Sequence, residues 1–106
     1  MKLSEKDFQQ QIIDLAHIYG WRIAHFRHAW SQDGRRCMTP VQADGKGWPD
    51  LVMVKGKRVI IAEVKSDTGK PTPEQQEWLD ALRQARMEVF LWRPKDWDTI
   101  QETITK

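Results

Sequence analysis

Two short motifs in the middle of the chain bring together side chains that can bind a divalent metal. Pro49-Asp50 opens one apolar, strand-like run, and Glu63-Val64-Lys65 closes the next one. If the two runs pair as a hairpin, Asp50 lies beside Glu63, and two adjacent carboxylates repel each other unless a cation holds them. We therefore expect a Mg²⁺ site formed by Asp50, Glu63 and the backbone carbonyl of Val64.

Lys65 adds a positive charge beside this pair. A divalent metal polarises a phosphoryl oxygen and lowers the pKa of a bound water, so the set supports phosphodiester hydrolysis. Lys65 could position or deprotonate the attacking water, or stabilise negative charge in the transition state. The alternative is a surface pair of Glu63 and Lys65 with Asp50 as a turn residue. The Pro-Asp motif before the first run favours the catalytic interpretation.

Hydrophobic periodicity predicts the elements that must hold these groups. Helices are expected at 4–19, 72–85 and 97–103, and strands at 21–27, 50–55, 58–65 and 88–92. The strand–helix–strand segment predicts two parallel neighbours, and the first three strands predict an antiparallel meander. We expect one α/β domain over residues 1–106, in the order α-β-β-β-α-β-α, with a central mixed sheet flanked by helices. A long loop is predicted at about 30–48.

Two polar residues near helix starts are further candidates for the site. Gln75 lies on the inner face of the second helix, which begins close to the strand end that carries Lys65. It either completes a capping box with Thr72 or joins the site. Glu5 precedes Phe8 by one helical step. It is either a favourable acid at a helix N-terminus or a residue linked to the metal or its water.

Basic and aromatic residues around the long loop are candidates for contact with nucleic acid. They are Arg27, Arg35, Arg36, Lys46 and Trp48. The basic side chains could bind phosphates and the tryptophan could stack on a base. The alternatives are solubility for the charged residues and a core position for the tryptophan.

The overall composition narrows the function classes. With 40% hydrophobic and 30% charged residues the chain is globular, and it has no apolar run near 18 residues, so we expect no membrane insertion. The single Cys37 favours a reducing compartment such as the cytoplasm. Together with His25 and His28 it does not form a zinc pattern, so no zinc is expected. A net charge of +2 is compatible with nucleic acid without demanding it.

The combined pattern resembles VRR-NUC domains, a branch of the PD-(D/E)xK nuclease superfamily. The matching segments are Glu5-Lys6-Asp7-Phe8, Gly20-Trp21, Gly47-Trp48-Pro49-Asp50-Leu51, Ala62-Glu63-Val64-Lys65, Thr72-Pro73-Glu74-Gln75-Gln76-Glu77-Trp78-Leu79, Val89-Phe90-Leu91-Trp92-Arg93-Pro94 and Asp96-Trp97. The resemblance implies a restriction-endonuclease-like core and DNA cleavage dependent on Mg²⁺ or Mn²⁺. It implies Asp50 and Glu63 at the metal, Lys65 in catalysis, and Glu5 and Gln75 as accessory residues.

Short stand-alone members of this family resemble phage or bacterial proteins that act as homodimers on branched DNA, including four-way (Holliday) junctions. The leading hypothesis is therefore a metal-dependent, structure-selective DNA endonuclease in the cytoplasm of a bacterial or phage-infected cell. A two-fold dimer would suit paired nicks in a symmetric junction. The alternatives are a nuclease without branch preference, acting on linear, flap or single-stranded DNA, and a non-catalytic DNA-binding module with the nuclease fold.

Overall fold

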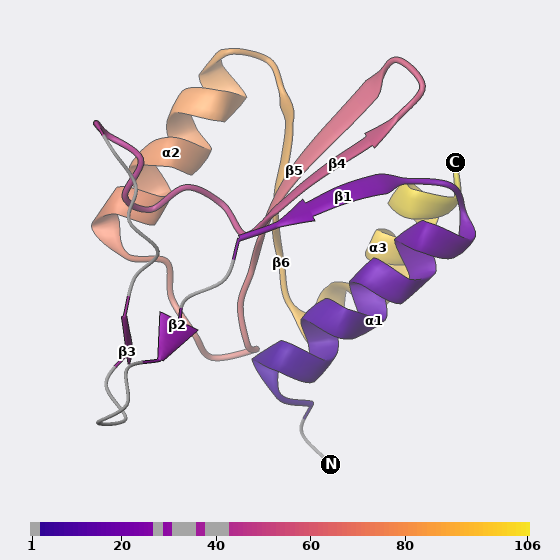
Figure 1. Cartoon of the computed structure of the whole chain (residues 1–106), viewed down its shortest axis with the longest axis horizontal. Helices are drawn as coiled ribbons and strands as arrows, with labels where there is room; N and C mark the ends of the chain where they lie inside the picture. The colour runs from indigo at the N-terminus through magenta and orange to yellow at the C-terminus, as the bar shows by residue number, and fades with distance from the viewer. Residues whose placement is uncertain (1–2, 27–28, 31–35, 38–42) are drawn as a thin grey trace.

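A four-stranded mixed sheet with helices on both faces forms the centre of the molecule (Figure 1). The computed structural model describes residues 3–26, 29–30, 36–37 and 43–106. The strands of the sheet are β1 (Arg22–His25), β4 (Leu51–Lys55), β5 (Arg58–Val64) and β6 (Glu88–Trp92). The helices are α1 (Glu5–Ile18), α2 (Pro73–Gln84) and α3 (Trp97–Thr105), the last preceded by a 3-10 turn, η1 (Pro94–Asp96).

The strand order is β1-β4-β5-β6. β1 pairs antiparallel with β4, β4 pairs antiparallel with β5, and β5 pairs parallel with β6 through the connecting helix α2. The predicted meander, the parallel pair and the order α-β-β-β-α-β-α are thus confirmed, and the arrangement is consistent with a restriction-endonuclease-like fold.

The predicted loop at about 30–48 needs one correction. Two short strands, β2 (Ala29–Trp30) and β3 (Arg36–Cys37), pair antiparallel as a separate ribbon. Strands of two residues are too short to produce an alternation of apolar and polar residues, so sequence periodicity could not reveal them.

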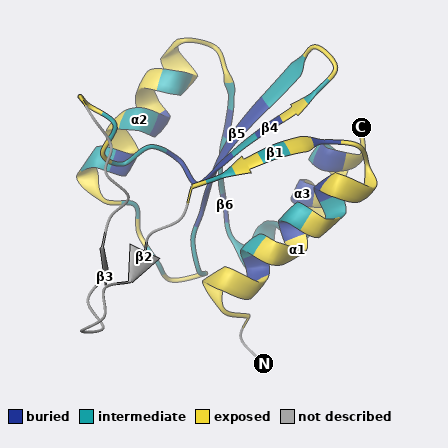
Figure 2. Ribbon diagram, in the orientation of Figure 1, coloured by how far each residue is buried: buried dark blue, intermediate teal, exposed yellow. Residues whose placement is uncertain are grey.

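One face of the sheet is covered by α1 and α3. Phe8, Ile12 and Ala16 recur every four residues along α1, and all three are buried. They pack with Ile100 and Ile104 of α3 against the alternate side chains of β4 and β5 that face this layer. Figure 2 shows the resulting buried stripe on α1, with its outward positions exposed.

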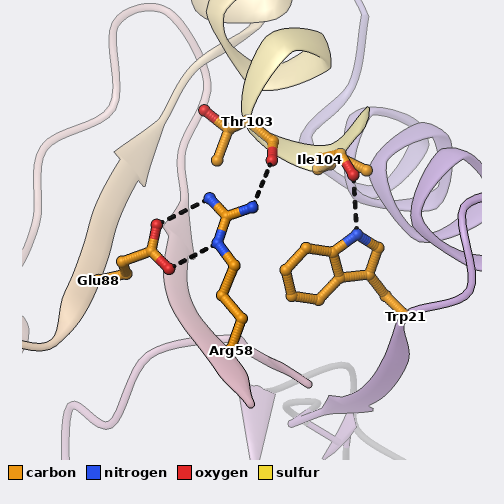
Figure 3. A network of polar contacts seen from close by, with 5 residues as sticks. All are labelled: Trp21, Arg58, Glu88, Thr103 and Ile104. Atoms are coloured by element: carbon orange, nitrogen blue, oxygen red, sulfur yellow. Dashed lines mark hydrogen bonds and ion pairs between the residues drawn. The ribbon is translucent and has the colours of Figure 1, made fainter. Parts of the chain in front are cut away.

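A polar network joins the end of the sheet at the start of β5 to the last turn of α3 (Figure 3). Arg58 donates two hydrogen bonds of 2.8 Å to the Glu88 carboxylate and one of 3.2 Å to the carbonyl of Thr103. Its guanidinium lies 5.4 Å from the Trp21 ring centroid, and the Trp21 indole donates to the carbonyl of Ile104 at 2.9 Å. These contacts lie at the opposite end of β5 from Glu63 and hold the scaffold rather than the candidate site.

The opposite face of the sheet is only partly covered. Leu79 of α2 packs on Ile61 and Val89, and Val52 of β4 packs against the same cluster, so this layer covers β5, β6 and part of β4. On the same face, Ala24 of β1 and Val54 of β4 are exposed. The central strand β5 is therefore covered on both sides, as its two apolar faces predict, whereas β1 is an edge strand of the sheet.

Candidate active site

Asp50 and Glu63 lie directly opposite each other at the end of the β4–β5 hairpin. Leu51 pairs with Ala62 in the ladder, so the next pair outward joins Asp50 to Glu63. The Asp50 Oδ2 atom accepts a hydrogen bond of 2.9 Å from the backbone N–H of Val64. Both carboxyl groups are buried, with 8% of Asp50 and 1% of Glu63 exposed. The hairpin thus holds two carboxyl groups together away from water.

Glu63 cannot easily hold a negative charge in this position without a cation. Its pKa is raised to about 10, chiefly by burial and then by a hydrogen bond with Asp50 and the negative charge of Asp50. The positive charge of Lys65 lowers the pKa and the negative charge of Glu5 raises it. The Glu63 Oε2 atom is buried and has no hydrogen-bond partner among the described residues. A buried acceptor without a donor is costly unless a cation occupies its lone pairs.

The oxygen atoms around this pair suit a hard divalent cation. Asp50 and Glu63 offer carboxylate oxygens. In a β-strand the N–H and C=O of one residue point to the same edge, so the N–H contact from Val64 to Asp50 places the Val64 carbonyl on the Asp50 side. Within the described ranges no group of three or more His, Cys, Asp and Glu side chains is placed to hold a metal. Two carboxylates and a carbonyl are the oxygen ligands that Mg²⁺ takes when water completes its coordination, and binding of Mg²⁺ here remains a prediction.

Lys65 follows β5 directly. Glu63 is two residues earlier in the chain, so the two side chains lie on the same face of the strand. Its backbone N–H donates to the carbonyl of Trp92 at 3.0 Å, so the parallel ladder continues through this residue. Lys65 is half-buried, and its charge acts on the pKa of Glu63. The ammonium group thus belongs to the same electrostatic cluster as the two carboxyl groups.

The turn after Lys65 is fastened to the segment that follows β6. The Arg93 Nη1 atom donates to the carbonyls of Ser66, at 2.8 Å, and of Gly69. Asp67 Oδ1 accepts from the backbone N–H of Lys95 at 3.1 Å. Arg93 was matched only as part of a family segment, and its positioning role was not predicted. The signal that could have found it is a basic residue placed just after the strand that neighbours β5.

Gln75 makes the capping box that its spacing from Thr72 predicts. The Gln75 Oε1 atom accepts from the Thr72 N–H at 2.9 Å, and Thr72 Oγ1 accepts from the Gln75 N–H at 3.2 Å. The side chain is buried on the face of α2 that looks toward the sheet. Its role at the active site remains a prediction.

Glu5 begins α1 and is exposed. Because its charge raises the pKa of Glu63, the start of α1 lies close enough to the carboxylate pair to act on it electrostatically. Its link to the metal or water remains a prediction.

The segment before Pro49 is docked on the first turn of α2. Gly47 has a φ of +89°, and a Cβ atom there would lie 2.6 Å from the Glu74 carbonyl carbon and 2.8 Å from the Gln75 nitrogen. The Trp48 ring packs edge to face on Trp78, with centroids 4.9 Å apart. Glycine at position 47 therefore allows the chain to approach α2 and enter β4 with Asp50 correctly placed.

Of the residues predicted to contact DNA, the structure describes the side chains of Lys46 and Trp48. Lys46 is exposed and forms a 3.5 Å ion pair with Glu74, while Trp48 has a packing role against Trp78. Arg27 and Arg35 lie outside the described residues. The backbone of Arg36 forms part of β3, and its side chain lies outside the described set.

Comparison with known families settles what kind of domain this is. A model of the VRR-NUC domain matches residues 5–95, most of the 106-residue chain. The chain belongs to the VRR-NUC family. The prediction made from the motifs is thereby confirmed, and membership implies a nuclease whose substrate is DNA. No curated protein and no solved structure gives a significant match.

The matched region of this VRR-NUC domain contains the whole candidate site, from Glu5 through Asp50, Glu63 and Lys65 to Gln75. Among the described residues, no helix is long and apolar enough to cross a membrane.

Proposed function

We propose that this VRR-NUC domain is a metal-dependent endonuclease that hydrolyses phosphodiester bonds in branched DNA. The observation that carries the proposal is the pair of buried carboxyl groups of Asp50 and Glu63, in which Glu63 Oε2 has no hydrogen-bond partner among the described residues. Burying two such groups side by side is costly, because one of them must either keep its proton or face a like charge. A divalent cation explains why both are present.

Each residue then has a distinct role. Asp50, Glu63 and the Val64 carbonyl would hold the cation, with Asp50 kept in place by the Val64 N–H. When bound, a divalent cation supplies the charge that polarises a phosphate oxygen and makes a water acidic. Lys65 presents its ammonium group to the same face, where it positions the attacking water or balances negative charge in the transition state. Arg93 keeps the turn after Lys65 fixed.

Selectivity for branched DNA and action as a homodimer complete the proposal. One small domain has limited surface for two DNA arms, whereas two copies related by a two-fold axis present two sites to a symmetric junction. Sedimentation of the protein with and without DNA tests the dimer. A monomer that cuts junctions at full rate would refute it.

The experiment that tests the function compares four-way, flap, linear duplex and single-stranded DNA of matched sequence in parallel digestions. Each is carried out with Mg²⁺, with Mn²⁺ and with a chelator, using the wild type and Lys65→Ala. We expect junction cleavage at least tenfold faster than linear cleavage, and none with the chelator or the variant. Equal rates on all substrates would refute the branch preference. Tight junction binding without cleavage under either metal would refute the enzyme and favour a binding module.

A further inference from the structure

Phe26 lies in the same row of the sheet as the two carboxyl groups. His25 pairs with Leu51, so the next pair along β1 and β4 joins Phe26 to Asp50. The backbone N–H of Phe26 donates to the Asp50 carbonyl at 2.9 Å, which shows that the pairing continues past the end of β1. Since Asp50 is in turn opposite Glu63, the three residues form one row across three neighbouring chain segments.

The Phe26 side chain is on the same face of the sheet as Glu63. Ile23 packs against the core beneath α1 and α3. Side chains alternate along a strand, so Phe26, three residues later, is on the opposite face, toward α2. Glu63 is on that face too, two residues after Ile61, which packs against Leu79 of α2. The aromatic ring and the carboxyl groups therefore lie on the same face of the sheet.

This face of the sheet is exposed to solvent at Phe26. Phe26 is 49% exposed, and among the described residues the cluster around Leu79 of α2 reaches only as far as Val52 of β4 on this face. An exposed apolar side chain is ordinary in itself. What distinguishes Phe26 is its position: neighbouring strands are about 4.8 Å apart, so it lies one strand from Asp50 and two from Glu63.

We propose that the Phe26 ring is a stacking platform for a nucleobase next to the scissile phosphate. The inference rests on the proposed function, because it places that phosphate at Asp50 and Glu63. A nucleotide with its phosphate at the carboxylates reaches a ring one strand away, and every base has a face that can stack on an aromatic ring. A protein partner is the poorer occupant, because burying Phe26 would also obstruct access to Asp50.

The test measures DNA binding with Ca²⁺ in place of Mg²⁺, so that stacking is separated from cleavage. A four-way junction carries the fluorescent base 2-aminopurine, placed in turn at each nucleotide near the branch. We expect quenching at one position with the wild type and with Phe26→Trp. Phe26→Ala and Phe26→Leu should lose the quenching and bind about 5- to 100-fold more weakly. Tyr19→Ala, which removes an exposed aromatic ring at the far end of α1, is the control and should match the wild type.

An abasic nucleotide at the quenched position gives a second readout. It should weaken the wild type to the level of Phe26→Ala and leave that variant unaffected, because both changes remove the same contact. If the losses of DNA affinity from the abasic nucleotide and from Phe26→Ala were additive, the proposal would be overturned. It would also be overturned if Phe26→Ala bound DNA and quenched the fluorescence as the wild type does. Loss of self-association in Phe26→Ala with unchanged DNA affinity would also overturn it and identify a protein interface. A wild type that quenches but never cleaves with Mg²⁺ or Mn²⁺ would refute the proposed function and leave the stacking site intact.

Discussion

The Asp50 carboxylate is held beside Glu63 by a 2.9 Å hydrogen bond from the backbone N–H of Val64. This N–H lies beyond the last regular pair of β4 and β5, so no backbone carbonyl of β4 pairs with it in the ladder. The side chain of Asp50 takes that place. The strand end is thereby satisfied, and the carboxylate is fixed before any ligand arrives.

The raised pKa of Glu63 predicts that the metal-free protein loses stability as pH rises. Between the ordinary pKa of 4.5 and about 10 the folded protein keeps a proton that the unfolded chain has lost. The unfolded state therefore binds fewer protons, and the free energy of unfolding falls with pH in this window. Glu63→Gln should remove this slope and stabilise the metal-free protein at pH 8 by roughly 1–2 kcal/mol.

Chemical denaturation at pH 5, 7 and 9 with a chelator measures this dependence. Glu102→Gln, which changes an exposed glutamate on α3, serves as the control and should keep the wild-type slope. Mg²⁺ should restore stability mainly at the higher pH, because its binding displaces the proton from Glu63. A wild-type stability that rises from pH 5 to pH 9 would contradict the account of this carboxyl.

Gly47→Ala should destabilise the protein by about 2–4 kcal/mol, because it adds a clash with the backbone of α2 to the cost of a positive φ. Gly56→Ala is the matched control. Gly56 also has a positive φ, of +61°, but its Cβ would meet nothing within 4 Å. Its cost should be about 1–2 kcal/mol. Thermal unfolding of both variants tests the difference, and equal losses would show that the close approach to α2 is unimportant.

Variants of Gln75 and Thr72 distinguish a helix-capping role of Gln75 from a role at the active site. Each side chain makes one half of the same capping box, so Gln75→Ala and Thr72→Ala should each cost about 1 kcal/mol of stability. If Gln75 also serves the active site, Gln75→Ala should reduce cleavage at least tenfold more than Thr72→Ala. Initial cleavage rates at a temperature where both variants are folded decide this. Equal rates would leave Gln75 with the capping role alone.

Arg93→Met should loosen the turn that follows Lys65, because it removes hydrogen bonds to two backbone carbonyls. We expect a loss of about 1–3 kcal/mol and a fall in kcat of at least tenfold with little change in KM. Arg83→Met removes an exposed 3.7 Å pair with Asp80 and should be nearly silent. If Arg93→Met and Arg83→Met had the same effect on kcat, Arg93 would not position Lys65.

The sequence predicted the scaffold because most of its signals are local. Ser4 and Thr72 cap the helices that they were expected to cap, and the apolar runs on either side of Gly56 form the expected hairpin. The pairing of Asp50 with Glu63 followed from that hairpin, since a tight turn fixes the register of the strands that it joins.

What could not be predicted depends on contacts between distant segments. The docking of Gly47 on α2 joins residues nearly thirty positions apart, and the contact of Arg93 with the turn after Lys65 is similar. The position of Phe26 opposite Asp50 depends on pairing across the long loop, whose length hides the register. Such relationships have no periodic trace in the sequence.

The central claim is that Asp50 and Glu63 form the metal site at which DNA is cut. Junction cleavage by Glu63→Gln, titrated with Mg²⁺ and with Mn²⁺, tests it most directly. The amide keeps the shape of the side chain and should leave the fold intact. We predict a folded variant that cleaves at least a thousandfold more slowly than the wild type at every metal concentration. Cleavage by Glu63→Gln at the wild-type rate would contradict the claim.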